Sequence, residues 1–529
     1  MSETMGLART SARGTYNLLL GMTVSAAISA FGLVILARLL PPSEYGLYLV
    51  VLIAPNFMIV FRDWGVPLAV IRSTAQYRAK NKIGEIKNLM IAGLIFELLM
   101  GMILTVTLFI SSDFLATAIF RRPEIADLIK IASVSIVAGA LVVFSQSAFQ
   151  GYERMGLVGV TMIIQSVLNS SIAPVLVILG HGVLGAIVGY TASLILSGIV
   201  NVILFYRRVY TGLRISRSIG ATNLVGATKG MLSYGLPLSI CFLATGFFAQ
   251  FCVSLMARTS SDVTIGNYQV ASSLAMMLTF VATPLTTVLF PLFSKIGARR
   301  DRESLRVVFR FSVKYSALIV VPTAAVIVTL ARPLVSTLFG SVYADAPFML
   351  VILTTSYLLA AFGGLSAGNL LKSHYSGAYT RITLISVLLV LPLAVVLISY
   401  LGAVGLVITS AVLSIPSLSL ALWYLDAHSG ITLDWISSTK ILAASALSAT
   451  VTYFLVSQLD SEPWIQLVAG LGTFLLAYIV ITPVIGAVDS FDIKFFREIR
   501  GELGPFSYIV GPLIAIMDSI CSRLEHKLP

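Results

Sequence analysis

The residues best suited to chemistry in this sequence are ionisable side chains inside long apolar runs. Arg62 and Asp63 interrupt one such run just ahead of Gly65 and Pro67, and Glu97 lies near the middle of the next run. A charge at the centre of a membrane span costs about 2.5–3.5 kcal/mol or more, so such residues usually mark a substrate or ion pathway. A guanidinium can pair an anionic group through forked donors, and a buried carboxyl group can carry a proton.

Each of these residues also has a structural interpretation. Arg62 either faces a central cavity or extends its guanidinium to the cytoplasmic interface while Asp63 pairs locally. Glu97 either carries a proton or is a neutral acid that is hydrogen-bonded to a neighbouring helix. The residues themselves leave both alternatives open.

Composition predicts the elements that must position these side chains. Of 529 residues, 57% are hydrophobic and only 11% are charged, and the mean hydropathy is +0.96. Soluble domains carry about 25% charged residues, so most of this surface must face lipid and a soluble enzyme is excluded. We expect an all-α polytopic membrane protein with about fourteen transmembrane helices, because the apolar runs are continuous and do not alternate as barrel strands do. The runs are 16–38, 46–71, 88–110, 128–150, 156–179, 183–206, 232–257, 265–293, 312–331, 347–371, 379–400, 403–424, 438–458 and 463–487.

The distribution of cations predicts the orientation. If the N-terminus is cytoplasmic, most of the 35 Lys and Arg residues fall on the cytoplasmic side, as the positive-inside rule requires. We therefore expect both termini in the cytoplasm. Topology accounts for most of the net charge of +12, so the basic composition does not indicate a nucleic-acid partner.

An internal repeat predicts the domain organisation. The pattern Ala37-Arg38 followed by Gly46-Leu47-Tyr48 recurs as Ala257-Arg258 followed by Gly266-Asn267-Tyr268, and the glycines at 182 and 185 recur at 402 and 405 with the same offset. Six runs fit in one period, so the two halves have parallel topology, which is a transporter architecture. We expect an N-lobe at 1–206, a cytoplasmic linker at 207–231, a C-lobe at 232–426, two further helices within 427–487 and a cytoplasmic tail at 488–529.

Arg38 and Arg258 occupy the repeated corner on the outer side, against the general bias of the cations. A structural interpretation pairs them with Glu44 and Asp262, which lie within reach along the sequence.

The sequence lacks the motifs of several common kinds of chemistry. There is no GxxxxGK[ST] phosphate loop, and the four histidines are scattered without zinc-site spacing. The outer loops hold no close pair of carboxylates of the kind that a metal-dependent glycosyltransferase needs. We therefore expect no enzyme activity, no metal and no cofactor.

Two segments resemble a known family. The stretch Leu36–Tyr48, LARLLPPSEYGLY, looks like the N-terminal signature of the polysaccharide flippases of the multidrug/oligosaccharidyl-lipid/polysaccharide export superfamily. Asp63–Arg72, DWGVPLAVIR, is similar to that family's second-helix segment, although Trp64 replaces the usual small or aliphatic residue. The resemblance implies a V-shaped cavity between two lobes that opens alternately to each side. Basic residues in it would hold the diphosphate of a polyprenyl-linked glycan.

Carried onto matching positions, the resemblance implies Arg62 and Arg72 as the first residues to bind the headgroup phosphate, followed by Arg38 and Arg258. Glu97 and Asp63 are the candidates for ion coupling.

We therefore expect a flippase of polysaccharide biosynthesis that moves lipid-linked oligosaccharide across the plasma (inner) membrane by alternating access. Its partners would be the lipid-linked glycan and anionic membrane lipids, and the chain would act as a monomer. One alternative is a cation-coupled multidrug exporter of the same superfamily, which would need more acidic residues inside its lobes. A membrane glycosyltransferase or ligase is a second alternative, disfavoured by the short outer loops.

Overall fold

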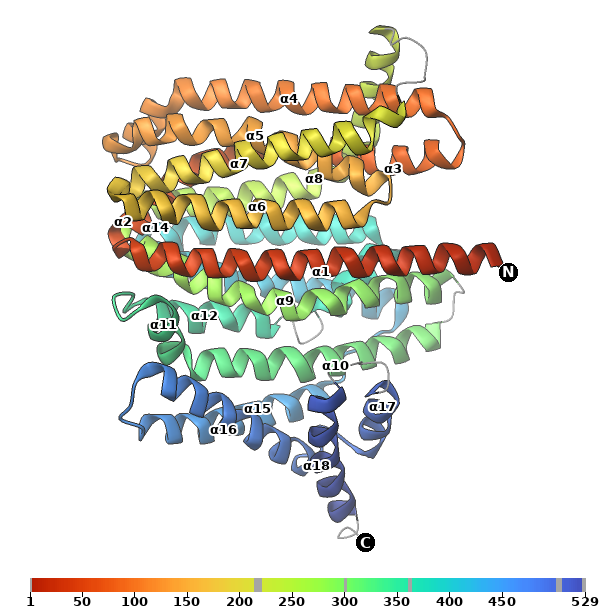
Figure 1. The fold of residues 1–529 in the computed structure, drawn as a ribbon. Coiled ribbons are helices and arrows are strands. Elements are labelled where there is room, and N and C mark those ends of the chain that lie inside the picture. The colour runs from red at the N-terminus through yellow and green to blue at the C-terminus, as the bar shows by residue number, and fades with distance from the viewer. Residues whose placement is uncertain (1, 214–220, 299–301, 360–363, 501–506, 526–529) are drawn as a thin grey trace. The chain divides into compact units, whose positions relative to one another are not determined.

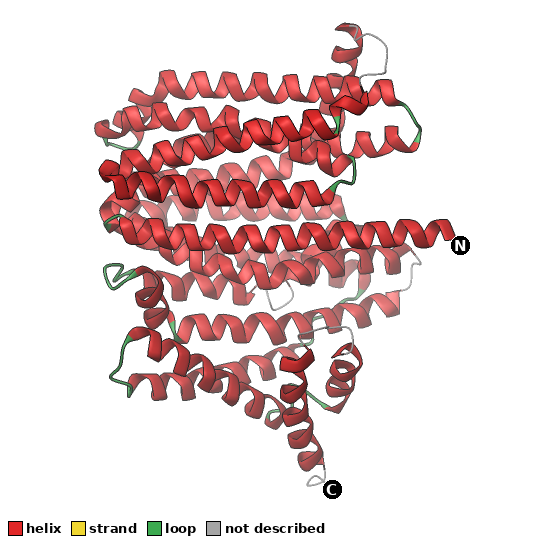
Figure 2. Cartoon of the chain, viewed as in Figure 1, coloured by secondary structure: helices red, strands yellow, loops and turns green. Residues whose placement is uncertain are grey.

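Long helices form nearly all of the structure, a computed structural model that describes residues 2–213, 221–298, 302–359, 364–500 and 507–525 (Figure 1). Within these ranges the secondary structure is helix joined by short loops, with no strand (Figure 2). A helix satisfies its backbone hydrogen bonds internally, which a chain in lipid requires. The expected all-α polytopic fold is therefore confirmed.

The membrane spans follow the apolar runs. Nine helices in the described part of the chain are long and apolar enough to cross a membrane. Two of these nine, 155–208 and 376–429, each contain two of the predicted runs. The figure of fourteen crossings stays a prediction.

The internal repeat is visible in the backbone of these two long helical segments. Gly182 has φ 48° and ψ −134°, and its repeat mate Gly402 has φ 57° and ψ −129°. Only glycine adopts this conformation readily, so both halves bend at the same place and for the same reason. The repeated glycines therefore correspond to a repeated structural element.

The described chain forms two compact units by contact. The first comprises Met1–Gln269 and Leu391–Leu406. In Figure 1, α1 lies beside α6, and α4 lies beside α5. Its helices are α1 (Ser2–Leu39), α2 (Pro42–Ile59), α3 (Val66–Ala79), α4 (Ile83–Phe114), α5 (Ala126–Gly151), α6 (Met155–Leu176), α7 (Gly182–Arg208) and α8 (Ala221–Thr259), with the start of α9 (Asp262–Ala298) and the middle of α14 (Ser376–Ser429).

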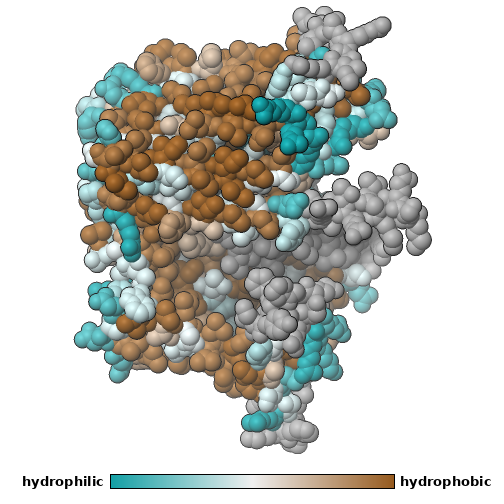
Figure 3. All heavy atoms as spheres, viewed as in Figure 1, coloured by the Kyte–Doolittle hydropathy of each residue, from teal (hydrophilic) through white to brown (hydrophobic). Residues whose placement is uncertain are grey.

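Apolar packing holds the first unit together and extends it beyond the predicted N-lobe. Its core contains fully buried side chains such as Met90, Phe144 and Phe149. Helix α8 packs against α2, where the rings of Phe57 and Phe247 meet edge to face at 5.6 Å. Over α4 to α7, apolar side chains cover the middle of the helices and hydrophilic ones gather at both ends, as expected in a bilayer (Figure 3). The predicted lobe boundaries stay a prediction.

The second unit comprises Val270–Val390 and Val407–Pro529. It holds the rest of α9 and of α14, and ends in two amphipathic helices that pack against each other. Its remaining helices are α10 (Arg302–Thr329), α11 (Ala331–Phe339), α12 (Ala346–Leu359), α13 (Leu365–His374), α15 (Trp435–Ser457), α16 (Pro463–Val484), α17 (Ser490–Arg500) and α18 (Ser507–Glu525).

Candidate functional site

A break in the second apolar run positions Arg62, the most buried cation among the described side chains of the first unit. Helix α2 ends at Ile59 and α3 begins at Val66, so the predicted continuous run 46–71 is interrupted. Trp64 and Gly65 have φ values of 43° and 76° in the left-handed region, and the Trp64 indole donates a 2.6 Å hydrogen bond to the carbonyl of Phe61. A left-handed conformation is unfavourable for a bulky residue, and such backbone is concentrated at functional sites.

Close approach to α8 explains the glycine in this break. A Cβ added at Gly65 would collide with the backbone carbonyl of Gly235. A Cβ added at Gly235 would in turn lie 3.0 Å from the carbonyl oxygen of Trp64. The broken helix therefore meets α8 through two residues that lack side chains.

Arg62 lies in this break and is held inside the bundle by two carboxylates. Its side chain is 3% exposed, and its Nε lies 2.6 Å from Asp63 Oδ1 and 3.5 Å from Glu97 Oε2 on α4. Its Nη1 donates to the carbonyl of Ile136 on α5 at 3.3 Å. Asp63 pairs locally, as one of the two alternatives for this segment had it, and its partner is Arg62. The guanidinium does not extend to an interface, because these partners from α4 and α5 fix it in the interior.

Glu97 is the least satisfied member of this triad. Its side chain is 1% exposed, and within the described residues neither carboxyl oxygen accepts a hydrogen bond. Its charged neighbour Arg62 is shared with Asp63, which is closer. The triad therefore brings one cation and two carboxyl groups together, and at the buried Arg62 and Glu97 the binding or release of one proton changes the balance of charge.

Arg72 has different partners from Arg62. It is exposed on α3, and its guanidinium lies 4.1 Å from the ring centroid of Tyr234 on α8. This is cation–π geometry, which holds the side chain against the same helix that meets the break at Gly65. The structure places Arg62 in the bundle and Arg72 at its surface.

Arg38 and Arg258 are exposed at the ends of α1 and α8, where the two repeated corners touch. A Cβ at Gly46 would collide with the backbone of Asp262, and a Cβ at Gly266 would lie 2.5 Å from the carbonyl oxygen of Pro42. Pro42 and Asp262 occupy equivalent positions in the repeat, so the contact has an approximate two-fold symmetry.

The carboxylate of Asp262 has a partner that the sequence did not indicate. Arg122 Nη2 lies 2.7 Å from Asp262 Oδ1, and the same guanidinium donates to the carbonyls of Ala257 and Ser260 at the end of α8. A cation is favourable at a helix C-terminus, where carbonyl groups lack partners within the helix. The expected pairing of Asp262 with Arg258 is therefore corrected to Arg122.

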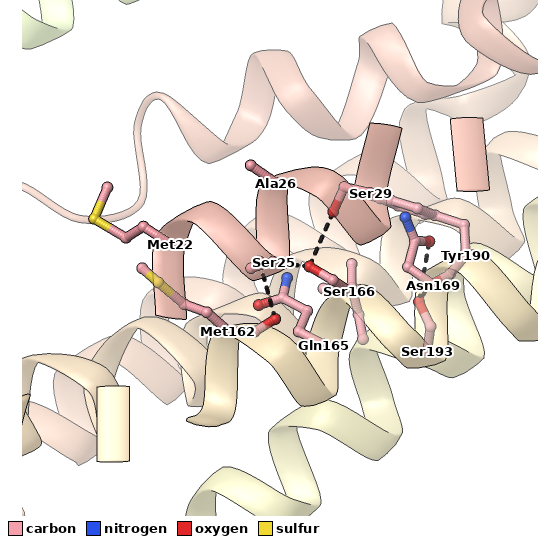
Figure 4. Close-up of a pocket in the computed structure, with 11 residues that line it drawn as sticks. Met22, Ser25, Ala26, Ser29, Met162, Gln165, Ser166, Asn169, Tyr190 and Ser193 are labelled. Atoms are coloured by element: carbon pink, nitrogen blue, oxygen red, sulfur yellow. Dashed lines mark hydrogen bonds between the residues drawn. The ribbon is translucent and has the colours of Figure 1, made fainter. Parts of the chain in front are cut away.

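An uncharged polar pocket of about 360 Å³ lies among α1, α6 and α7 (Figure 4). The hydroxyls of Ser25 and Ser166 are 2.6 Å apart, and Ser29 donates to Ser166 at 2.9 Å. Across the pocket Ser193 donates to the side-chain carbonyl of Asn169 at 3.3 Å. The other polar side chains of the wall are Gln165 and Tyr190.

The residues of this pocket carry a signal in the sequence, although the pocket was not among the predicted sites. Ser25 and Ser29 are four residues apart on one helix, as are Gln165 and Asn169 on another, so each pair lies on one helical face. That spacing indicates a polar stripe on each helix. It does not indicate that the two stripes face each other.

Comparison with known proteins assigns the chain to a family. Residues 11–297, more than half of the chain, match the family described as "Polysaccharide biosynthesis protein". The chain belongs to the polysaccharide biosynthesis protein family. All six predicted site residues lie within the matched range.

Relatives of this polysaccharide biosynthesis protein include membrane proteins of archaea. It is 21% identical over 436 residues to "Uncharacterized membrane protein MJ1068" of Methanocaldococcus jannaschii, covering 79% of this chain and 85% of that protein. It is 22% identical over 269 residues to "Probable low-salt glycan biosynthesis flippase Agl15" of Haloferax volcanii, covering 51% of this chain and 57% of that protein.

A solved structure shares the fold. The structure titled "Lipid II flippase MurJ, inward closed conformation" matches with a TM-score of 0.68 at 14% identity, covering 91% of this chain and 99% of that one. Together with the apolar helices, this likeness shows that the family member described here is a multi-pass membrane protein with a transporter fold.

Proposed function

We propose that this protein is a flippase that translocates polyprenyl-(di)phosphate-linked oligosaccharide across the plasma membrane by alternating access. The observation that carries the proposal is family membership over 11–297, the range that contains the buried arginine at the broken helix. A relative named as a glycan flippase supports the same substrate class. The protein would act as a transporter and not as an enzyme.

The physical task of such a protein suits this fold. A polar headgroup must pass a hydrocarbon barrier of about 30 Å while its lipid tail stays in the bilayer. Two parallel lobes that rock around one site provide alternating access. We propose that the lobes are 1–206 and 232–426, joined by the linker 207–231, with helices within 427–487 and a tail at 488–529 outside the repeat.

Arg62 is the first candidate to bind the headgroup phosphate. Its guanidinium can offer forked donors to a diphosphate, which then competes with the carboxylates of Asp63 and Glu97. Protonation of Glu97 would weaken its hold on Arg62, so this carboxyl group is the candidate for coupling transport to an ion gradient. Arg72 is the second candidate, and Arg38 and Arg258 at the repeated corners follow.

The uncharged pocket of Figure 4 favours a glycan over a cationic drug. Hydroxyl and amide groups such as those of Ser29, Gln165 and Asn169 suit the hydroxyl groups of a neutral sugar. A cationic drug would favour a carboxylate in the wall, and the residues that line this pocket include none.

Both termini would lie in the cytoplasm, because that orientation puts most of the 35 Lys and Arg residues on the inner side. The chain would act as a monomer with a lipid-linked glycan as substrate and anionic lipids around it.

A deletion strain tests the proposed function. Loss of the protein should make the lipid-linked glycan accumulate with its sugars on the cytoplasmic face, while resistance to cationic drugs stays unchanged. Drug sensitivity without glycan accumulation would instead support a multidrug exporter and would contradict the proposal.

A further inference from the structure

The first unit has a basic cavity that is separate from the buried triad. It has a volume of about 510 Å³ and lies where α3, α5 and α7 end and where α4 and α6 begin. Three arginines from three segments of the chain line it: Arg78, Arg154 and Arg208. Cations that are scattered in the sequence are therefore gathered in one place.

The position of the cavity along the helices corresponds to the headgroup region of a bilayer. The apolar spans 83–119, 123–151 and 155–208 all begin or end at its wall. Basic pockets at the cytoplasmic ends of membrane helices bind phosphorylated lipid headgroups. The predicted orientation puts these ends in the cytoplasmic leaflet.

Contacts within the wall hold two of the arginines. Arg78 lies 5.2 Å from the ring centroid of Tyr152, and its Nη1 lies 3.7 Å from Glu153 Oε2. Arg154 donates from Nη1 to the backbone carbonyl of Arg208 at the end of α7. Glu153 brings one negative charge and its side chain is 70% exposed, so the wall keeps a net positive charge.

Two helix N-termini add to the attraction for an anion. Helix α4 begins at Ile83 and α6 begins at Met155, and neither of these described helices has a side-chain cap at its N-terminus. The first backbone N–H groups of a helix lack partners within the helix, and the helix dipole places partial positive charge there. Guanidinium groups beside helix N-termini provide donors that suit phosphate oxygens.

We propose that this cavity binds the phosphate group of a membrane lipid headgroup in the cytoplasmic leaflet. The lipid is either an anionic phospholipid or a polyprenyl diphosphate, since both present the same chemistry at this depth. The site lies apart from Arg62, so binding of an anionic phospholipid there does not depend on the flippase function, whereas binding of a polyprenyl diphosphate rests on it.

Native mass spectrometry of the full chain released from nanodiscs tests the site. Phosphatidylglycerol in a phosphatidylcholine background should bind the R78Q/R208Q variant at least about tenfold more weakly than wild type, because each cation near an anionic lipid contributes on the order of 1 kcal/mol. The matched control is K80Q/R207Q, which removes the same charge from exposed neighbours outside the wall. The control should bind as wild type does.

Further measurements identify the lipid that binds and show whether a variant has a folding defect. The same variants are titrated with polyprenyl diphosphate and with inorganic phosphate, and their unfolding temperatures are measured in detergent. Weaker binding of either lipid to R78Q/R208Q alone, at a wild-type unfolding temperature, supports the site and identifies its ligand. Equal weakening in both variants, no weakening in either, or competition by inorganic phosphate as effective as by lipid would overturn the proposal.

Discussion

At position 62 one buried guanidinium is shared by two carboxyl groups, that of the buried Glu97 and that of Asp63, whose side chain is 38% exposed. The Nε–Oδ1 distance of 2.6 Å to Asp63 and the Nε–Oε2 distance of 3.5 Å to Glu97 make Asp63 the stronger partner. A buried charge is tolerated only where it is paired, so the buried Arg62 depends on its two carboxyl partners. The free energy of unfolding of variants therefore tests the triad without a transport assay.

Removal of the guanidinium should destabilise the protein more than removal of either carboxylate charge. Arg62→Ala leaves the buried carboxyl group of Glu97 and the partly exposed one of Asp63 without a cation, and we expect a loss of about 3–5 kcal/mol in the free energy of unfolding. Glu97→Gln keeps the shape of the side chain and leaves the pair of Arg62 with Asp63 intact, so its effect should be much smaller. Denaturant titration in detergent micelles measures both.

Arg72→Ala is the control for this experiment. Arg72 is exposed, and its contact with Tyr234 is worth about 0.5–1 kcal/mol at such a site. If Arg62→Ala were no more destabilising than Arg72→Ala, the buried triad would not be a structural unit.

The sequence predicted part of this site. One of two open alternatives had Asp63 pair locally, and the structure shows that pair with Arg62 as the partner. The interfacial position that the same alternative gave to Arg62 is not found, because the Arg62 side chain is 3% exposed. The contact of Arg62 with Glu97 joins two helices, and the packing of neighbouring spans is not encoded in sequence spacing. Asp262 is a similar case, because its partner Arg122 is distant in sequence and the nearer Arg258 was expected.

At the scale of elements, the break between α2 and α3 depends on a glycine. Gly65→Ala should destabilise the protein by more than about 1 kcal/mol, because a Cβ is disfavoured at φ 76° and collides with the carbonyl of Gly235. Thermal unfolding in detergent measures the change.

Gly226→Ala in α8 is the matched control for Gly65→Ala. A Cβ at Gly226 meets nothing within 4 Å, and alanine favours a helix, so stability should stay equal or rise by about 0.4–1 kcal/mol. Equal destabilisation by the two substitutions would contradict the close approach at Gly65.

Helix α17 is held against α10 by ion pairs that depend on pH. Lys314 Nζ lies 2.6 Å from the buried Asp492 and 3.6 Å from Asp489. Partial burial tends to raise the pKa of Asp489, but the backbone N–H of Asp492 and the Lys314 ammonium outweigh it and hold that pKa below its usual value. The pKa of Asp489 is lower in the docked state than its unfolded value of about 3.9, so its charge stabilises docking at pH values above about 3.9. This contribution is lost as the pH falls through the lowered pKa.

Limited proteolysis at different pH values tests this attachment. The segment around α17 should be protected at pH 5 and above and should become more accessible below about pH 4. Lys314→Met should increase cleavage at all pH values, because it leaves Asp492 buried without its cation. Protection that is independent of both pH and Lys314 would contradict the ion-pair attachment.

Most elements were predictable because lipid requires apolar runs and helices. The repeat also predicted that Gly182 and Gly402 have the same role, and their backbone angles agree. The break at 60–65 was only partly predictable. Glycine and proline indicated a weak helix, but nothing in the sequence indicated the left-handed conformation of Trp64 or the close approach of this backbone to Gly235 of α8. The boundaries of the first unit likewise depend on contacts of α8 and not on the run pattern.

At the scale of the whole molecule, the cations predict the orientation. A tag at the C-terminus should be cleaved by protease in inside-out vesicles and protected in right-side-out vesicles, because both termini are expected in the cytoplasm. Cleavage in right-side-out vesicles alone would reverse the orientation. It would also move the basic cavity at Arg78 and Arg208 to the outer leaflet.

The central claim is that this member of the polysaccharide biosynthesis protein family moves a lipid-linked glycan and that arginines bind its phosphate. Transport of a fluorescent polyprenyl-diphosphate oligosaccharide in proteoliposomes tests it most directly, with wild type compared with R62K/R72K and R62A/R72A. Wild type should translocate the lipid, the alanine pair should lose at least about tenfold in rate, and the lysine pair should retain part of it, since lysine keeps the charge but not the forked donors. No translocation by folded wild-type protein, or an unchanged rate in R62A/R72A, would contradict the account.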